Sequence, residues 1–215
     1  MALKFSPEEK KLLLLLKTPQ QIQDFVDNIP TNWEPEGDTC ISPLRVLQEN
    51  RAHCIEAAML AALILRLHGH KPLLLDLTAN SKDQDHVLAL FRIDGSWGAI
   101  AKSNHYCLGY RDPIYKTIRE LVMSYFHEYL NKAGEKTLRS YSIPLNLKTL
   151  DTKNWMTNEK NVWFVAEALI KLPHTKILER TQERLLRKAD DFTRDVNNIE
   201  RERRDRRRTQ HVLNN

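Results

Sequence analysis

The feature that most constrains this fold is the apolar stretch Asn50–Leu67, which is rich in alanine and leucine after Cys54. Alanine and leucine are strong helix formers, and Gly69 supplies the residue type that usually follows a helix end. Apolar side chains occupy nearly every angle around the axis, which indicates a helix buried on most sides. Two arginines and a glutamate inside the stretch argue against a membrane span. We therefore expect the central helix of a globular core, capped by Asn50.

The composition indicates one globular domain, alone or with an appendage. The chain has 215 residues, of which 41% are hydrophobic and 28% charged, enough to bury a core. The net charge of +5 is uneven, because residues 200–208 hold six arginines against three acids. Such a run is typical of a solvated, self-paired helix face, with contact to RNA or an acidic partner as the alternative. The rest of the chain is nearly balanced, so we do not expect nucleic-acid binding.

Three cysteines, Cys40, Cys54 and Cys107, occur at no metal-like spacing. Their odd number and spacing argue against a disulfide framework or a zinc site, and we expect no metal and no cofactor. Reduced thiols are typical of the cytoplasm. The first residues lack the features of a signal peptide, so the expected location is cytoplasmic, without a membrane partner.

The order of predicted elements gives an α+β fold. Ser-Pro or Thr-Pro pairs begin three helices before the central one, and Asp94-Gly95 is a hairpin turn signal between two strands. Helices are expected over 7–17, 19–28, 44–49, 115–130 and 161–172, and strands over 72–77, 86–93, 96–102 and 137–143. We divide the chain into an N-terminal helical part (1–50), a core (51–176) and a charged C-terminal helix and tail (177–215).

The C-terminal segment carries a coiled-coil-like apolar pattern. Spacings of four and three alternate along Leu185, Ala189, Phe192, Val196 and Ile199, and Leu178 lies one heptad earlier. This pattern predicts a long helix that packs along the domain or against a partner helix, such as that of a second copy.

The best candidate for chemistry is Cys54 together with His86. A thiol in the first turn of a helix feels the positive end of the helix dipole, which favours the thiolate. A helix packed on a sheet can bring Cys54 to His86, which begins a predicted strand. A thiol nucleophile needs such a base and a third group that orients the base. His53 can tune the thiol, and Lys102 can hold the thiolate or an anionic substrate.

Three motifs follow one another in an order that resembles a known superfamily. They are Arg51-Ala-His-Cys-Ile-Glu-Ala-Ala, Asp85-His-Val-Leu-Ala-Leu-Phe and Gly95-Ser-Trp-Gly-Ala-Ile-Ala-Lys-Ser-Asn104. Together they resemble the transglutaminase-like (papain-like thiol) superfamily, in its branch of small bacterial proteins. The resemblance implies a central helix packed on an antiparallel sheet, and a Cys-His-Asp triad that hydrolyses amides or transfers acyl groups to amines. Cys54 would be the nucleophile and His86 the base, acting on a peptide or small amide.

The sequence departs from the family pattern at the third member of the triad. Ala101 stands where the resemblance implies Asp, four residues after Trp97, which itself is either a core residue or part of the cleft. We expect Asn104 to orient His86, with Ser103 close by. Asp76 and Asp85 are alternatives from the other side of the hairpin. The rival hypothesis is an inactive binding or scaffold protein that oligomerises or binds a partner through its C-terminal helix.

Overall fold

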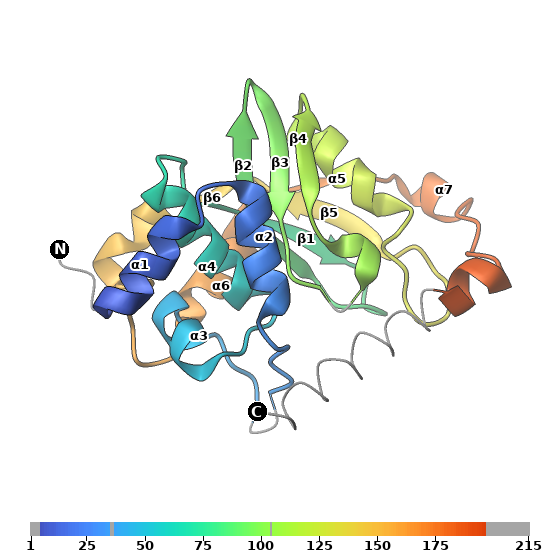
Figure 1. Cartoon of the computed structure of the whole chain (residues 1–215). Helices are drawn as coiled ribbons and strands as arrows, with labels where there is room; N and C mark the ends of the chain where they lie inside the picture. Colours follow the sequence, from blue (N-terminus) through green and yellow to red (C-terminus); the bar gives the residue numbers. More distant parts are fainter. Residues whose placement is uncertain (1–4, 35–36, 104, 197–215) are drawn as a thin grey trace.

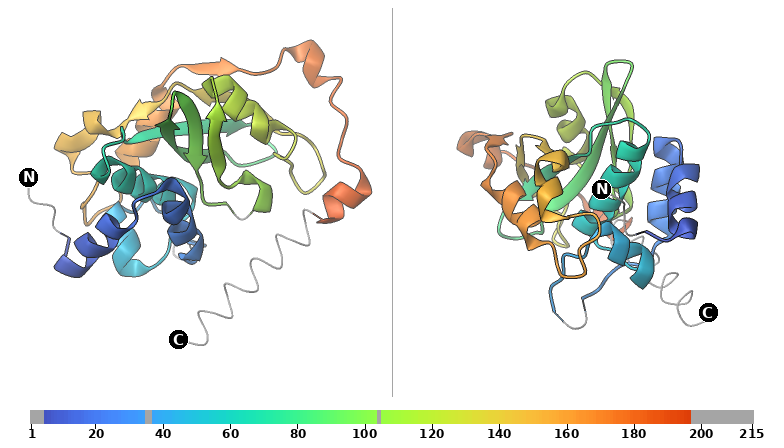
Figure 2. Two further views of the ribbon diagram at one scale, coloured as in Figure 1. Left: turned by 45° about the horizontal axis from the view of Figure 1, so that its top comes forward. Right: turned by 90° about the vertical axis from the view of Figure 1, so that its left-hand side faces the viewer.

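A computed structural model describes residues 5–34, 37–103 and 105–196 of the chain (Figure 1). It has a mixed α+β fold, in which helices cover both faces of one antiparallel sheet (Figures 1 and 2). The α+β class and the antiparallel sheet confirm the prediction. None of the helices in these described ranges has the length and apolar character needed to cross a membrane.

The sheet runs in the order β4-β3-β2-β1-β5-β7, and all its pairs are antiparallel. Its strands are β1 (Leu73–Ala79), β2 (His86–Ile93), β3 (Ser96–Ile100), β4 (Arg111–Tyr115), β5 (Leu138–Ser142), β6 (Leu145–Asn146) and β7 (His174–Lys176), with β6 beside the start of β1. The β2–β3 hairpin turns at Asp94 and Gly95, whose φ angles are 47° and 78°. Such positive angles at both positions suit a tight hairpin turn, as the Asp-Gly pair predicted.

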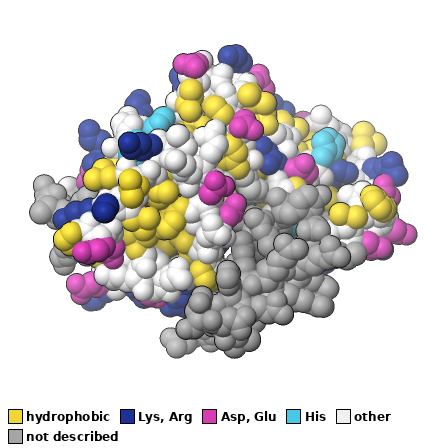
Figure 3. Space-filling view, in the orientation of Figure 1, with side chains coloured by type: hydrophobic (Ala, Val, Ile, Leu, Met, Phe, Trp, Pro, Cys, Tyr) yellow, Lys and Arg dark blue, Asp and Glu magenta, His cyan; other side chains and the backbone are white. Residues whose placement is uncertain are grey.

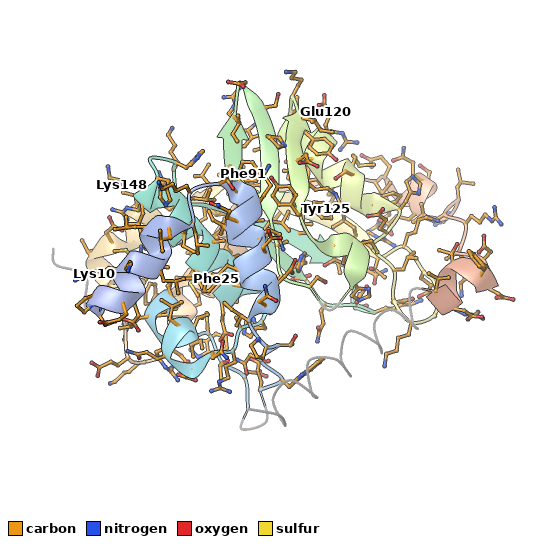
Figure 4. All side chains as sticks on the ribbon, viewed as in Figure 1. Lys10, Phe25, Phe91, Glu120, Tyr125 and Lys148 are labelled. Carbon is orange, nitrogen blue, oxygen red and sulfur yellow. The ribbon has the colours of Figure 1, made fainter. Side chains whose placement is uncertain are left out.

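Two apolar cores lie on opposite faces of the sheet. One contains α1 (Pro7–Leu15), α2 (Pro19–Asn28), α3 (Pro43–Glu49), α4 (Cys54–Leu67) and α6 (Trp163–Lys171); the other contains α5 (Ile118–Phe126). Phe25 and Phe91 belong to the first and Tyr125 to the second (Figure 4). Every residue of α4 from Ile55 to Leu65 is buried. The prediction of a buried central helix is therefore confirmed.

Local capping explains why the helix starts were predictable. Ser6, Thr18 and Ser42 each accept a hydrogen bond from a backbone N–H three residues later, and each precedes a proline. The cap satisfies a donor that the helix leaves open, and proline at the first position needs no donor. Figure 3 shows apolar side chains gathered over α1, where Leu14 and Leu15 are exposed.

The predicted start of the central helix is wrong by one turn. Asn50 adopts a left-handed conformation (φ 47°) and ends α3, so it does not cap α4. Ala52 instead bridges to the α2–α3 loop, where its N–H donates to the Pro30 carbonyl (3.0 Å) and its carbonyl accepts from the Asn32 N–H (3.1 Å). These bonds hold the chain extended, so α4 begins at Cys54 with His53 as its N-cap residue.

The predicted continuous helix from Ile177 is wrong over residues 177–179 and 184–190. Ile177 donates to the Arg139 carbonyl beside β7, and in the described residues this segment is helical at α7 (Arg180–Glu183) and over residues 191–196. Residues 186–190 are not helical. The Ala189 N–H donates to the Gly134 carbonyl (2.8 Å), which holds this segment against the turn that contains Gly134. Phe192 is 79% exposed. Ile199 and the arginine run lie outside the described residues.

Candidate active site

A cavity of about 420 Å³ opens at the N-terminal end of α4. Five parts of the chain line it: the α2–α3 loop with Trp33 and Glu34, the start of α4, the end of the β1–β2 loop with the start of β2, the segment after β3, and Tyr129 after α5. Cys54 and His86 both line this cavity. The structure therefore brings together the two residues that the sequence singled out.

Cys54 is the first residue of α4 and is partly exposed at the cavity. The helix is fourteen residues long, and its N-terminal end carries the positive end of the helix dipole. Cys40 and Cys107 are also free thiols, but neither lines the cavity. The position of Cys54 thus combines access with a favourable field for a thiolate.

His86 is held by a backbone carbonyl. It begins β2 opposite Leu77 and is 5% exposed, and its Nε2 lies 3.0 Å from the carbonyl oxygen of Leu108. A carbonyl oxygen only accepts, so Nε2 carries the hydrogen of this bond. This contact leaves Nδ1 for the hydrogen bond that His86 makes with Cys54.

His53 approaches the same sulfur from the residue before it. Its ring also makes a hydrogen bond with Cys54. On its other side, Nε2 lies 2.9 Å from the Thr39 carbonyl oxygen, 3.3 Å from Oε1 of Glu34 and 3.4 Å from Oε1 of Glu56. All three are acceptors, so Nε2 is a donor here. The thiol therefore lies between two imidazole rings.

These surroundings set the ionisation of the thiol. Burial alone would raise the pKa of Cys54, but hydrogen bonds from His53 and His86 outweigh burial and lower the pKa to about 6, from an ordinary value of 9.0. Burial likewise opposes the charge on His53, yet its contacts with Cys54 and Glu56 raise its pKa to about 9. At neutral pH the two residues form a thiolate–imidazolium pair.

The other two thiols behave in the opposite way. Burial, reinforced by the charge of Glu56, raises the pKa of Cys40 to about 12. Burial and the charge of Glu128 raise the pKa of Cys107 to about 11. Both remain protonated at neutral pH, in contrast to Cys54.

No side chain in the described residues takes the third position of a triad. Ala101 has its N–H and carbonyl bonded to the Gln23 side chain (3.0 and 2.8 Å), and its methyl group lies in the α5 core. Asp85 lines the cavity but accepts from the Ala79 N–H (2.8 Å). Asp76 pairs with His174 at 3.2 Å and does not line the cavity. Asn104 lies outside the described residues.

The remaining supporting candidates have other contacts. Lys102 is 3% exposed and donates to the carbonyls of Val26 (3.1 Å) and Ile29 (2.5 Å), so its ammonium group closes the C-terminal end of α2. Ser103 lines the cavity and accepts from the His105 N–H (2.9 Å).

Trp97 does not line the cavity. It packs in the α5 core beside Arg92, near the turn of the β2–β3 hairpin. This turn is at the opposite end of the hairpin from His86, so Trp97 lies too far along the hairpin to line the cavity.

Sequence reasoning missed the groups that hold the two histidines. Glu56 stands three residues after its N-cap residue His53 and accepts the His53 N–H (2.9 Å), the spacing of a capping box. The three-residue spacing between His53 and Glu56 is visible in the sequence and could have predicted this contact. The nearby arginines, Arg45 and Arg51, both bind Glu49.

No cluster of three or more metal-ligating side chains occurs in the described part of the chain. No protein-family model matches the sequence, and a search of curated proteins finds no match.

Proposed function

We propose that the protein is a thiol-dependent amide hydrolase or acyltransferase, in which Cys54 is the nucleophile and His86 the base. One observation carries this proposal: the thiol at the start of α4 shares a cavity and a hydrogen bond with His86, and its pKa is lowered to about 6. A thiolate at neutral pH beside an imidazole is the arrangement that acyl transfer through a thioester requires.

In the first half of the reaction, the Cys54 sulfur attacks the carbonyl carbon of an amide. The C–S bond forms and the carbonyl π electrons move to oxygen, where the N–H groups at the start of α4 favour negative charge. When the carbonyl reforms, the C–N bond breaks. The leaving nitrogen takes a proton that Nδ1 of His86 has accepted from solvent, and a thioester remains on Cys54.

In the second half, water or an amine attacks the thioester. His86 Nδ1 accepts the proton of the attacking group, the C–S bond breaks, and the thiolate returns. Throughout, the Leu108 carbonyl holds Nε2–H of His86, the task that an Asp or Asn side chain performs in other triads.

The same arrangement supports the assignment to the transglutaminase-like superfamily. Its three motifs fall on the start of α4, the start of β2 and the β3 segment, in one cavity-forming unit. The departure at Ala101 does not weaken the site, because His86 has a carbonyl acceptor. The assignment remains part of the proposal.

A small activated ester tests the function without knowledge of the natural substrate. We expect p-nitrophenyl acetate to give a burst of p-nitrophenolate and an acetyl group on Cys54, located by peptide mass spectrometry. Cys54→Ala should abolish the burst and His86→Gln should slow both halves of the reaction. Adding a primary amine then separates the two activities, since an acyltransferase forms the acetylated amine and a hydrolase forms acetate.

Cys107→Ala is the matched control, because this thiol lies outside the cavity. Its burst should equal that of the unaltered protein. Acetylation that is spread over all three thiols, or that persists in Cys54→Ala, would leave the binding or scaffold hypothesis in its place.

A further inference from the structure

A carboxylate–histidine pair, Glu56 and His53, lies beside the proposed nucleophile Cys54. The Glu56 side chain is fully buried. Its carboxylate accepts from the Thr39 hydroxyl (2.8 Å), the Asn32 side-chain amide (3.1 Å) and the backbone N–H groups of Ile41 and His53 (both 2.9 Å). Such a full set of donors suits a charged carboxylate, but a buried negative charge also needs a cation nearby.

His53 is the cation that the structure offers to Glu56. Among the described residues, the ion pairs of Glu56 involve His53 alone, with Nε2 3.4 Å from Oε1. Arg51 is close in sequence, yet its guanidinium binds Glu49 and the Asn32 side-chain oxygen. Glu34 adds a second carboxylate at 3.3 Å from the same ring nitrogen. His53 therefore faces two carboxylates on one side and the Cys54 sulfur on the other.

His86 has no such carboxylate. Its Nε2 lies against the neutral Leu108 carbonyl, and none of the ion pairs of the described chain includes it. The two rings around Cys54 are consequently different in kind, since one is held by negative charge and the other only by a hydrogen bond.

We propose that the two histidines divide the work: His53 is a standing imidazolium that holds the Cys54 thiolate, and His86 alone moves the proton. This inference rests on the proposed function. In the resting site the His53 ring lies between the Cys54 thiolate on one side and the Glu56 and Glu34 carboxylates on the other. Loss of the His86 proton to the leaving nitrogen leaves the His53 charge in place, so the sulfur departs as a stabilised thiolate in the second half of the reaction.

The pH dependence of the thiol should report this arrangement. The titratable and charged side chains that line the cavity with His53 are Glu34, Cys54, Asp83, Asp85, His86, Lys102, His105 and Tyr129, and Glu56 contacts the ring from the helix start. Of these, Cys54 and Glu56 act most strongly on the ring and favour its charged form.

The test is the rate of alkylation of Cys54 by iodoacetamide between pH 5 and 9.5, which follows the thiolate and needs no substrate. The unaltered protein should give a midpoint near 6. His53→Gln keeps a donor toward the Thr39 carbonyl but removes the charge, and should raise the midpoint by about one pH unit or more. Glu56→Gln should also raise the midpoint. If this variant does not fold, Glu34→Gln is the alternative, because the Glu34 side chain is partly exposed and also contacts the His53 ring.

Two further measurements separate the rings. ¹⁵N NMR should show both ring nitrogens of His53 protonated at pH 7.5. In the ester assay, the acylation rate of His53→Gln should recover at pH 9, where the thiol ionises unaided, whereas the second step in His86→Gln should not. His68→Gln is the matched control, since His68 contacts a carbonyl at the other end of α4 (3.3 Å).

The outcomes are distinct. A midpoint unchanged in His53→Gln, or a neutral His53 ring at pH 7.5, overturns the division of roles and leaves Cys54 and His86 as nucleophile and base. An ordinary midpoint near 8.5 in the unaltered protein overturns the activated nucleophile itself, and with it the proposed function.

Discussion

The three cysteines differ in their surroundings, and this difference predicts selective modification of one. At pH 6.5 Cys54, with a pKa of about 6, is largely thiolate, whereas the pKa of Cys107 is about 11. We expect iodoacetamide to modify Cys54 at least about tenfold faster than Cys107 at this pH, because the thiolate is the reacting form. Peptide mass spectrometry after short exposures measures both rates in one sample. Comparable rates would contradict the lowered pKa.

At the residue scale, the sequence pointed to Cys54 and His86, which share a cavity, but not to the groups that hold them. Cys54 and His86 were recognisable because side-chain chemistry and position along an element are visible in a sequence. The Leu108 and Thr39 carbonyls were not, since every residue carries a carbonyl and only the folded chain shows which one meets a ring. The role of Glu56 was accessible through its spacing from His53, a local signal.

At the scale of elements, one glutamine joins α2 to the end of β3. The Gln23 side chain donates to the Ala101 carbonyl (2.8 Å) and accepts its N–H (3.0 Å), so it continues the sheet as a neighbouring strand would. Gln23→Ala leaves both buried backbone groups without a partner. We expect a loss of about 1–3 kcal/mol in the free energy of unfolding, measured by urea denaturation.

Gln20→Ala is the control for this change, because Gln20 lies exposed on the same helix. It should alter the free energy of unfolding by less than about 0.5 kcal/mol. Equal effects of the two substitutions would show that the loss comes from the helix and not from the contact with Ala101.

Element prediction succeeded where the signal was local. The caps at Ser6 and Thr18 and the Asp94-Gly95 turn are set by neighbouring residues, so their elements were found with nearly correct bounds. The short strands β4, β6 and β7 were missed, because their pairing with distant strands decides them. The long C-terminal helix failed for the same reason, since contacts to residues 134–139 compete with helix formation.

At the scale of the whole molecule, His53 and Cys54 couple the site to stability. The pKa of His53 is about 9 in the folded chain against 6.5 in the unfolded chain. Its contribution to the free energy of unfolding is therefore fully present below pH 6.5 and is lost as the pH rises through 9. The pKa of Cys54 is lower in the folded chain, about 6 against 9.0, so its contribution is full above pH 9 and is lost as the pH falls through 6. Between pH 6.5 and 9 a rise in pH therefore weakens the stabilising contribution of His53 and strengthens that of Cys54, and the two changes oppose each other.

We therefore expect the free energy of unfolding to vary little between pH 6.5 and 8.5 in the unaltered protein. In Cys54→Ser the hydroxyl does not ionise in this range, so the thiol contribution is lost; the histidine contribution that remains is smaller, because it then depends on Glu56 and the Thr39 carbonyl without the contact with the thiolate. The stability of this variant should fall as the pH rises. Urea denaturation at pH 6.5, 7.5 and 8.5 compares the two proteins, and parallel profiles would contradict the coupling.

The hydrogen bond from His86 to the Leu108 carbonyl affects which positions of the chain tolerate mutation. An orienting Asp or Asn can be lost by one codon change, but a main-chain oxygen is present whichever side chain occupies position 108. A saturation scan of this protein should therefore find Cys54, His86 and the proposed thiolate holder His53 intolerant, but no side chain that is essential for orienting His86. Position 108 should accept other apolar residues that fill the same buried space. Searches that recognise such enzymes by three conserved side chains would pass over this arrangement.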